Sequence, residues 1–350
     1  MQSAAAARDL SSGLDASREF ALRDAAELER FAENFLVVTY DPKLDIGLWL
    51  HLGTWPDDFG IYEDQVLISL PGDGGQLCMF AYHRPLTEER PAGANLKFRC
   101  IEPFRCWSVS FDGLVTPCSD AEMRSGRVRD GAKELARIEL TLTMQAPVWD
   151  AHQSASSRHG GGSMAEQVWA SSHYQQLYTA QGQITLRGET HGFAGTGMRD
   201  HSRGRRGHGM DQWGGHVLAT AWFPESRRGF GLQRMWTPEG RITLDTAFVV
   251  IDGHLHHAAA VESPKLEKLI SRGESLQVVL KSDLGEHRMR CMTLRTHFTT
   301  PQNPLGMAYG ADLSGPYGIY APGHARWEWD TAIGYGLMER SARLDPATQT

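Results

Sequence analysis

Residues 136–144, ARIELTLTM, alternate strictly between apolar and polar side chains. The isoleucine and both leucines share one face of an extended chain, and the glutamate and both threonines share the other. A period of two is typical of a strand that buries one face. The stretch therefore predicts a β-strand in the wall of an antiparallel sheet.

Similar strand-like runs recur along the chain. They cover residues 47–52, 65–70, 76–82, 96–100, 107–111, 175–186, 216–222, 230–236, 242–251, 276–280, 288–298, 325–330 and 334–338. Glycine-containing segments at 71–75, 112–113 and 252–253 lie between such runs and predict hairpin turns. So many strands favour two sheets or barrels over one.

Helical spacing is clear only in residues 17–34, where apolar side chains recur about every third position. Residues 163–170 and 263–272 are shorter helix candidates. The Ser- and Gly-rich stretch 154–163 has the composition of a linker. We expect it to be a loop over an opening, with a connection between domains as the alternative.

Composition narrows the class of protein. The 350 residues carry 35 Lys and Arg against 42 Asp and Glu, a net charge of −7, which argues against a nucleic-acid or anionic-membrane binder. No apolar run has the roughly 18 residues that a membrane span needs. The first 20 residues lack an apolar core, so we expect no secretory signal. Five cysteines without a CxxC pair predict neither disulfides nor a zinc cluster, and hence the cytoplasm.

The chemically densest stretch is residues 195–215, GTGMRDHSRGRRGHGMDQWGG. Its charged and titratable side chains are Arg199, Asp200, His201, Arg203, Arg205, Arg206, His208 and Asp211. It matches neither a phosphate-binding P-loop nor a dinucleotide-binding loop. Flanking arginines would lower the pKa of Asp200, whereas burial would raise it and make Asp200 a general acid. A salt-bridged loop that only joins two sheets is the structural alternative.

The strand at residues 172–178, SHYQQLY, offers two polar faces. Tyr174, Gln176 and Tyr178 share one face, and His173 shares the other with Gln175. Either face could supply hydrogen bonds to a barrel interior.

Other catalytic and cofactor motifs are weak or missing. The histidines in residues 254–257 lack a nearby carboxylate, so a metal site is not expected there. No GxSxG nucleophile motif occurs, nor any fingerprint for NAD, flavin or pyridoxal phosphate. We therefore expect a protein without cofactor or metal.

The strand motif HYxQ (His173 to Gln176), followed by RDHSxGxR (Arg199 to Arg206) and by Trp213, resembles the hydroxyneurosporene synthase (carotenoid hydratase)/AttH-like family. The resemblance implies a mainly β protein of two consecutive lipocalin-like antiparallel β-barrels with a short N-terminal helix. The implied boundaries are a tail and helix at 1–36, barrels at 37–195 and 196–342, and a tail at 343–350. A ligand cavity is expected between or within the barrels.

The resemblance also implies roles for individual residues. Asp200 falls on the family's proposed acid, and His201 and His173 fall on the accompanying histidines. The substrate-binding candidates are Arg199, Arg203, Tyr174, Gln176, Tyr178, Trp213 and Trp107. Arg203 stands where many relatives have tryptophan, which implies a more polar pocket than a carotenoid would need. Gln175 replaces an acid that is common in relatives.

Three functions follow from these features. The first is a cofactor-independent hydratase, dehydratase or other lyase, or a cyclase, acting on a hydrophobic terpenoid, steroid or polyketide-type substrate. The second is a lipocalin-like carrier that binds a hydrophobic ligand without chemistry. The third is a structural role in which the basic stretch locks two barrels together. The oligomeric state stays open, with a homodimer the commonest arrangement.

Overall fold

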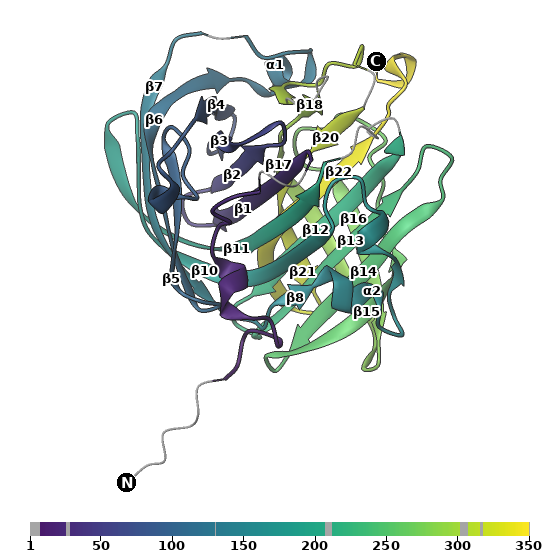
Figure 1. Ribbon diagram of the computed structural model, residues 1–350. Coiled ribbons are helices and arrows are strands. Elements are labelled where there is room, and N and C mark those ends of the chain that lie inside the picture. The colour runs from purple at the N-terminus through teal and green to yellow at the C-terminus, as the bar shows by residue number, and fades with distance from the viewer. Residues whose placement is uncertain are drawn as a thin grey trace.

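The computed structural model describes residues 8–25, 29–129, 131–206, 212–301, 307–315 and 318–349. Within these residues the strands form two sheets, each closed into an eight-stranded antiparallel barrel (Figure 1). The first ring runs β11-β1-β2-β3-β4-β6-β7-β10 and closes by pairing β10 with β11. The second runs β12-β13-β14-β15-β16-β17-β21-β22 and closes by pairing β12 with β22. The predicted fold of two consecutive β-barrels is confirmed.

The first barrel contains β1 (Phe31–Asp41), β2 (Ile46–Trp55), β3 (Asp58–Ser69), β4 (Gln76–His83), β6 (Cys106–Cys118), β7 (Glu134–Met144), β10 (Ser172–Leu186) and β11 (Glu189–Arg205). Beside it lie β5 (Leu96–Glu102) and β8 (Trp149–Asp150). The second contains β12 (Gly215–Phe223), β13 (Arg228–Trp236), β14 (Ile242–Ile251), β15 (His254–Glu262), β16 (Ser275–Ser282), β17 (Gly285–Thr296), β21 (Gly323–Trp329) and β22 (Ala332–Ala342). Short strands β9 (Gly161–Gly162), β18 (Thr299–Pro301), β19 (Met307–Tyr309) and β20 (Ile319–Ala321) join its sheet.

Helices are few and short in the described residues. They are α1 (Asp120–Arg124), α2 (Ala151–Ala155) and the 3₁₀ helices Ala16–Glu19, Thr87–Glu89, Met164–Glu166 and Pro346–Thr348.

The alternation in β7 appears directly as burial. From Ala136 to Met144 every second side chain is buried, and the intervening ones are exposed. By contrast, all nine residues of β12 are buried. Val217 and Ala219 pack inside the second barrel, whereas Leu218 and Trp222 pack toward the first. Strands at the junction therefore lose the polar face because a second barrel covers it.

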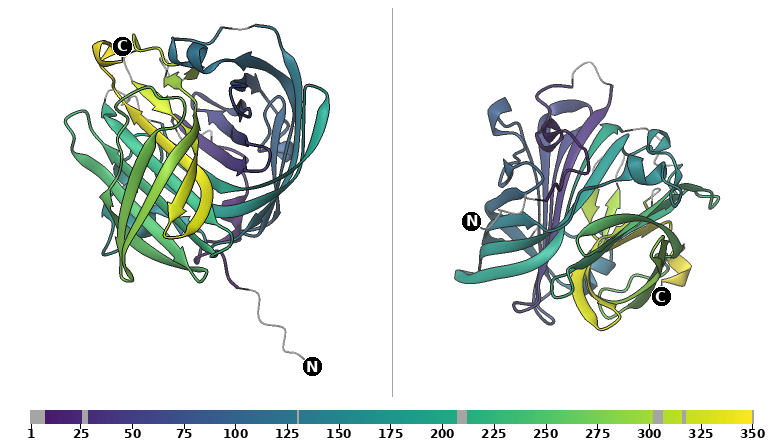
Figure 2. Two further views of the ribbon diagram at one scale, coloured as in Figure 1. Left: turned by 180° about the vertical axis from the view of Figure 1, so that it is seen from behind. Right: turned by 90° about the horizontal axis from the view of Figure 1, so that it is seen from below.

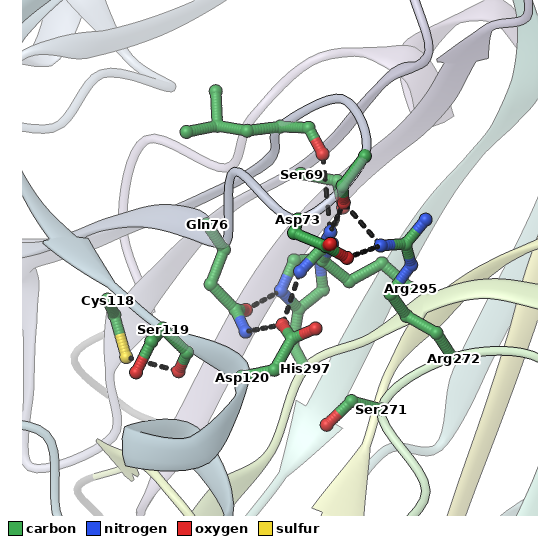
Figure 3. Close-up of polar contacts among 12 residues, drawn as sticks. Ser69, Asp73, Gln76, Cys118, Ser119, Asp120, Ser271, Arg272, Arg295 and His297 are labelled. Carbon is green, nitrogen blue, oxygen red and sulfur yellow. Dashed lines mark hydrogen bonds and ion pairs between the residues drawn. The ribbon is translucent and has the colours of Figure 1, made fainter.

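The two barrels lie side by side, with β11 of the first beside β12 of the second (Figures 1 and 2). Between them lies a separate apolar cluster that includes Leu177, Met198 and Met235. Polar contacts also cross this interface (Figure 3). The Arg295 guanidinium donates to the carboxylate of Asp120 and to backbone carbonyls of the turn after β3. Next to it, His297 bonds to Ser69 (3.2 Å) and Gln76.

The predicted N-terminal helix is much shorter in the structure. Only Ala16–Glu19 is helical within the described part of residues 17–34, and it is a 3₁₀ helix. The run ends in β1, because residues 31–34 pair with β11 and Asn34 also pairs with β2. The expected helix at 163–170 is reduced to Met164–Glu166, and residues 263–272 have no helix. In that segment Leu266 packs into the cluster between the barrels, and the Ser271 carbonyl accepts from the Thr296 amide.

Two of the three predicted hairpin turns are confirmed. Residues 71–75 connect β3 to β4, and Asp252 and Gly253 connect β14 to β15 with positive φ angles of 51° and 72°. The turn predicted at 112–113 is wrong, because Asp112 and Gly113 pair with β7 within β6. The linker-like stretch 154–163 lies between β8 and β10 of the first sheet, and its Gly161 and Gly162 pair with β14 of the second barrel. The boundary expected at 195/196 falls within β11.

Candidate functional site

A cavity of about 300 Å³ lies between the two barrels, lined by the outer faces of both. The first barrel contributes side chains from β1, β2, β3, β10 and β11, and the second from β12, β13 and β22 with the adjoining β18, β19 and β20. The barrel interiors are instead filled by two apolar clusters. The space for a ligand is therefore between the barrels.

Aromatic side chains form much of the cavity wall. Trp49, Trp169, Trp213 and Tyr320 all line it. Trp213 stacks on Tyr320 with ring centroids 6.0 Å apart and an interplanar angle of 16°. Walls of this kind suit a hydrophobic ligand and can stabilise a developing cation.

Strand β11 divides the RDHSR motif between two environments. Because side chains alternate along a strand, Asp200 and Ser202 face the cavity, whereas Arg199, His201 and Arg203 face the interior of the first barrel. β11 pairs with β1 on one side and with β10 on the other over the whole motif. This pairing fixes which of its side chains face the cavity and which face the barrel interior.

Asp200 is a buried carboxyl group with no hydrogen bond to any described side chain or backbone group. Burial raises its pKa well above the ordinary value, and the negative charge of Glu339 adds to the rise. The positive charges of Arg206 and Arg199 oppose the shift but do not cancel it. Of the two effects that the sequence left open, burial is the stronger, so the pKa of Asp200 is raised.

Glu339 lies on the cavity wall that the second barrel forms, and it is hydrogen-bonded to His216. The Ser341 hydroxyl accepts from the indole N–H of Trp213 (3.0 Å) and from the backbone N–H of His216 (3.1 Å). Its single hydrogen is then directed to Nδ1 of His216, 2.6 Å away. Nε2 of His216 therefore carries the proton and donates to the Glu339 carboxylate at 2.9 Å.

His173 completes the wall near β10. Its Nε2 accepts from the Gln175 amide at 2.9 Å, and its buried Nδ1 has no partner in the described structure. Burial lowers the pKa of His173 to about 3, so the ring is neutral at physiological pH. The indole of Trp169 meets this ring edge-on at 5.2 Å.

A further group of titratable side chains, Glu63, His51 and Arg206, lines the cavity beside β2 and β3. Burial raises the pKa of Glu63 to about 7. Burial also lowers the pKa of His51 to about 3, and its ring stacks on Trp49. This part of the wall is polar but carries few full charges.

The first barrel's interior contains a polar network around Glu19, which is fully buried. Its carboxylate accepts from Arg199 (2.7 and 2.8 Å), from the Tyr174 hydroxyl (2.6 Å) and from the Trp107 indole (2.9 Å). Gln176 accepts a further hydrogen bond from Arg199 at 2.7 Å. The network ties residues 8–25 to the end of the barrel that carries the β5–β6 turn.

Glu33 forms the second half of this network from β1. It accepts from Nε2 of His201 at 2.8 Å and from Nε of Arg203 at 2.6 Å. Nδ1 of His201 lies 2.8 Å from the Tyr174 hydroxyl, which links the two halves. Arg203 therefore neutralises a buried carboxylate and does not line the cavity.

The structure brings three of the ten predicted site residues to the cavity: Asp200, His173 and Trp213. The other seven lie inside the first barrel: His201, Arg199, Arg203, Tyr174, Gln176, Tyr178 and Trp107. The predicted split of residues 172–178 into two faces is correct. The same alternation separates Asp200 from His201, which the motif placed together. His208 and Asp211 lie outside the described residues.

Sequence reasoning did not identify Glu339, His216, Glu63 or His51 as site residues. Their strands have no motif, and they meet only because two barrels pack together. Glu19 and Glu33 were missed for a similar reason, since the side chains that bond to them, such as Trp107, Arg199 and His201, lie at least 88 positions away along the chain. The one available signal was the surplus of arginine in residues 195–206, which requires carboxylates elsewhere.

The described residues contain no group of three potential metal ligands. Nor do they include a helix whose length and apolar character would allow it to span a bilayer. None of the five cysteines, all of which are described, forms a disulfide.

Solved structures share this arrangement. A Nitrosomonas europaea protein provisionally assigned as AttH aligns with a TM-score of 0.57 and 14% identity, covering 91% of this chain and 94% of that one. Kievitone hydratase from Nectria haematococca aligns at 0.53 and 10%, covering 89% of each chain. CghA, solved with Sch210972, aligns at 0.50 and 8%, covering 92% and 93%. At these identities the likeness shows the fold alone.

Fold and neighbours together define an architecture of two lipocalin-like barrels. The fold that the motif's resemblance implies is thereby confirmed. The chain belongs to the family described as a domain of unknown function, DUF7064, which matches residues 21–342. A search of curated proteins gives no match.

Proposed function

We propose that this protein is a lyase of the hydratase or dehydratase type, or a cyclase, that acts by acid–base chemistry on a hydrophobic terpenoid, steroid or polyketide-type substrate between the barrels. The observation that carries the proposal is Asp200, a buried carboxyl group in an aromatic-lined cavity that has no hydrogen-bond partner among the described residues. A carboxyl group kept protonated by burial is a general acid at neutral pH.

In the hydration direction, the Asp200 carboxyl transfers its proton to one carbon of a double bond. The cation that forms on the other carbon faces Trp49 and Trp169, and a water molecule adds to it. The Glu339 carboxylate, oriented by His216, accepts the proton that this water loses. The net change is one water added across the double bond, and exchange with solvent restores both carboxyl groups. Dehydration follows the same steps in reverse.

A cyclase would use the same acid without water. Protonation by Asp200 would start attack by a second double bond of the substrate on the cation, and loss of a proton to Glu339 would end it. Kievitone hydratase is a hydratase on a similar fold, which supports the water-adding form. We also propose a cytoplasmic location, which suits five cysteines that form no disulfide.

The experiment begins with native mass spectrometry of protein taken from its own host, to identify any bound small molecule. That compound is then incubated with the wild type and with Asp200→Asn, which keeps the side-chain shape but cannot donate an acidic proton. We expect the wild type to convert it, with a mass change of one water or none, and the variant to be slower by about 10²-fold or more. Turnover should also fall as pH rises through the raised pKa of Asp200.

His201→Gln is the matched comparison on the same strand. Because His201 faces the barrel interior, we expect this variant to lower stability while the folded protein keeps its turnover. Equal turnover by Asp200→Asn and the wild type would contradict the proposal. A ligand returned unchanged by every variant would instead support the carrier.

A further inference from the structure

Arg206 directly follows β11 and lines the cavity. Its backbone N–H donates to the carbonyl of Arg30 at 2.7 Å, and its own carbonyl accepts from Nε of Arg30 at 3.0 Å. These two hydrogen bonds hold the backbone of Arg206, from which the side chain extends. The Arg206 side chain is partly buried.

The three arginines that are buried in the described structure each pair with a carboxylate. Arg199 pairs with Glu19, and Arg340 with Glu274. Arg295 pairs with Asp120 in the same way (Figure 3). Arg206 is partly buried and lines the cavity, but it has no such ion pair within the described residues. A cation that is partly removed from water without a counter-charge is unfavourable, and proteins ordinarily pair it.

The nearest carboxyl groups do not supply a full counter-charge. Burial raises the pKa of Asp200 well above its usual range and that of Glu63 to about 7. Burial in turn lowers the pKa of Arg206 to about 10, which still leaves it charged at neutral pH. Neither of these two carboxyl groups therefore fully balances the charge of Arg206, and an anionic group on a ligand can do so.

We propose that the ligand carries an acidic oxygen group, such as a carboxylate or an enolate, on a hydrophobic skeleton, and that Arg206 binds this group. The guanidinium fork matches two oxygens of such a group, and the aromatic walls receive the skeleton. This assignment deepens the proposed function and rests on its ligand site, but it requires no turnover. It differs from the expectation for Arg203, whose guanidinium is already paired with Glu33.

The test compares two fluorescent probes that share one ring system. 1-Anilinonaphthalene-8-sulfonate carries an anionic oxygen group, and N-phenyl-1-naphthylamine is the same skeleton without it. Arg206→Gln removes the charge and keeps much of the side-chain length. We expect its Kd for the sulfonate to rise by at least about tenfold, and its Kd for the neutral amine to change less than about twofold.

Arg205→Gln is the matched control, because Arg205 is exposed and pairs with Glu29 on the surface. It should leave both affinities unchanged. A sulfonate affinity that is equal in Arg206→Gln and the wild type, or an equal loss for both probes, overturns the proposal.

A measurement on the wild type covers the case in which Arg206→Gln does not fold. 1-Naphthoate should displace the neutral amine at about tenfold lower concentration than 1-naphthylmethanol, which lacks the charge. Equal displacement by the two compounds overturns the proposal. The probes are not substrates, so the binding test and the Asp200 turnover test are independent. A negative result in one does not decide the other.

Discussion

Glu19 enters the first barrel from the N-terminal segment and accepts hydrogen bonds from Arg199, Tyr174 and Trp107. Burial alone would raise its pKa. The Arg199 charge and these hydrogen bonds together outweigh burial and hold the pKa below the ordinary 4.5. The stabilisation from ionised Glu19 is therefore complete above about pH 4.5 and is lost as pH falls through the lowered pKa.

Glu19→Gln tests this account at the scale of one residue. The change leaves Arg199 buried without a counter-charge, so we expect the free energy of unfolding at pH 7 to fall by about 3–5 kcal/mol. The variant should also lose less stability than the wild type between pH 6 and pH 3.5. Urea denaturation at several pH values measures both effects. Glu29→Gln, at an exposed ion pair, should change stability by less than about 1 kcal/mol, and an equal effect of the two substitutions would refute the account.

At the scale of the element, β11 carries the cavity acid on one face and the barrel's ion pairs on the other. It also passes very close to β1. A Cβ atom at Gly197 would lie 1.8 Å from the carbonyl oxygen of Val38, so the strand needs glycine there. At Gly192, on the same strand, a Cβ atom would meet nothing within 4 Å.

Gly197→Ala should therefore lower the free energy of unfolding by about 1–3 kcal/mol, because β1 and β11 must separate to admit the methyl group. Gly192→Ala should be neutral or stabilising by about 0.5–1 kcal/mol, since alanine loses less backbone entropy on folding. Chemical denaturation of the pair checks this prediction. A similar loss of stability in both variants would count against a close approach at Gly197.

Strands were the elements most readily predicted from the sequence, because the alternation of buried and exposed side chains is a local pattern. In β7 one face is exposed, so the sequence shows a period of two. In β12 both faces are buried, and only the length of its apolar run indicated a strand. The helix expected at 17–34 failed because tertiary contacts decide that segment, with Glu19 bonded inside the barrel and Phe31 paired in β1. Local periodicity does not contain that information.

At the scale of the whole molecule, the packing of the two barrels explains which site residues could be predicted from the sequence. Asp200, His173 and Trp213 came from motifs in contiguous sequence. His216 and Glu339 join them only through the packing of the second barrel on the first, which no local pattern records. The charge surplus of residues 195–206 was visible in the sequence, but its carboxylate partners, Glu19 and Glu33, were not.

The same packing predicts cooperative unfolding of the two barrels. Their contact faces bury a continuous apolar cluster, and Arg295 and His297 add polar bonds across the interface. Separation of the barrels would expose this cluster and leave buried polar groups unpaired. Neither barrel should therefore stay folded after the other has unfolded. We expect a single calorimetric transition whose van't Hoff and calorimetric enthalpies agree. Two resolved transitions would show that the barrels are independent.

The filled barrels have a consequence for how such a protein changes over evolutionary time. A lipocalin that holds its ligand inside the barrel must hollow out its own core to accept a larger one. Here the ligand space lies between two intact cores. Substitutions that reshape it remove little of the packing that keeps either barrel folded. Lineages with this architecture are therefore free to diversify in substrate while the scaffold persists.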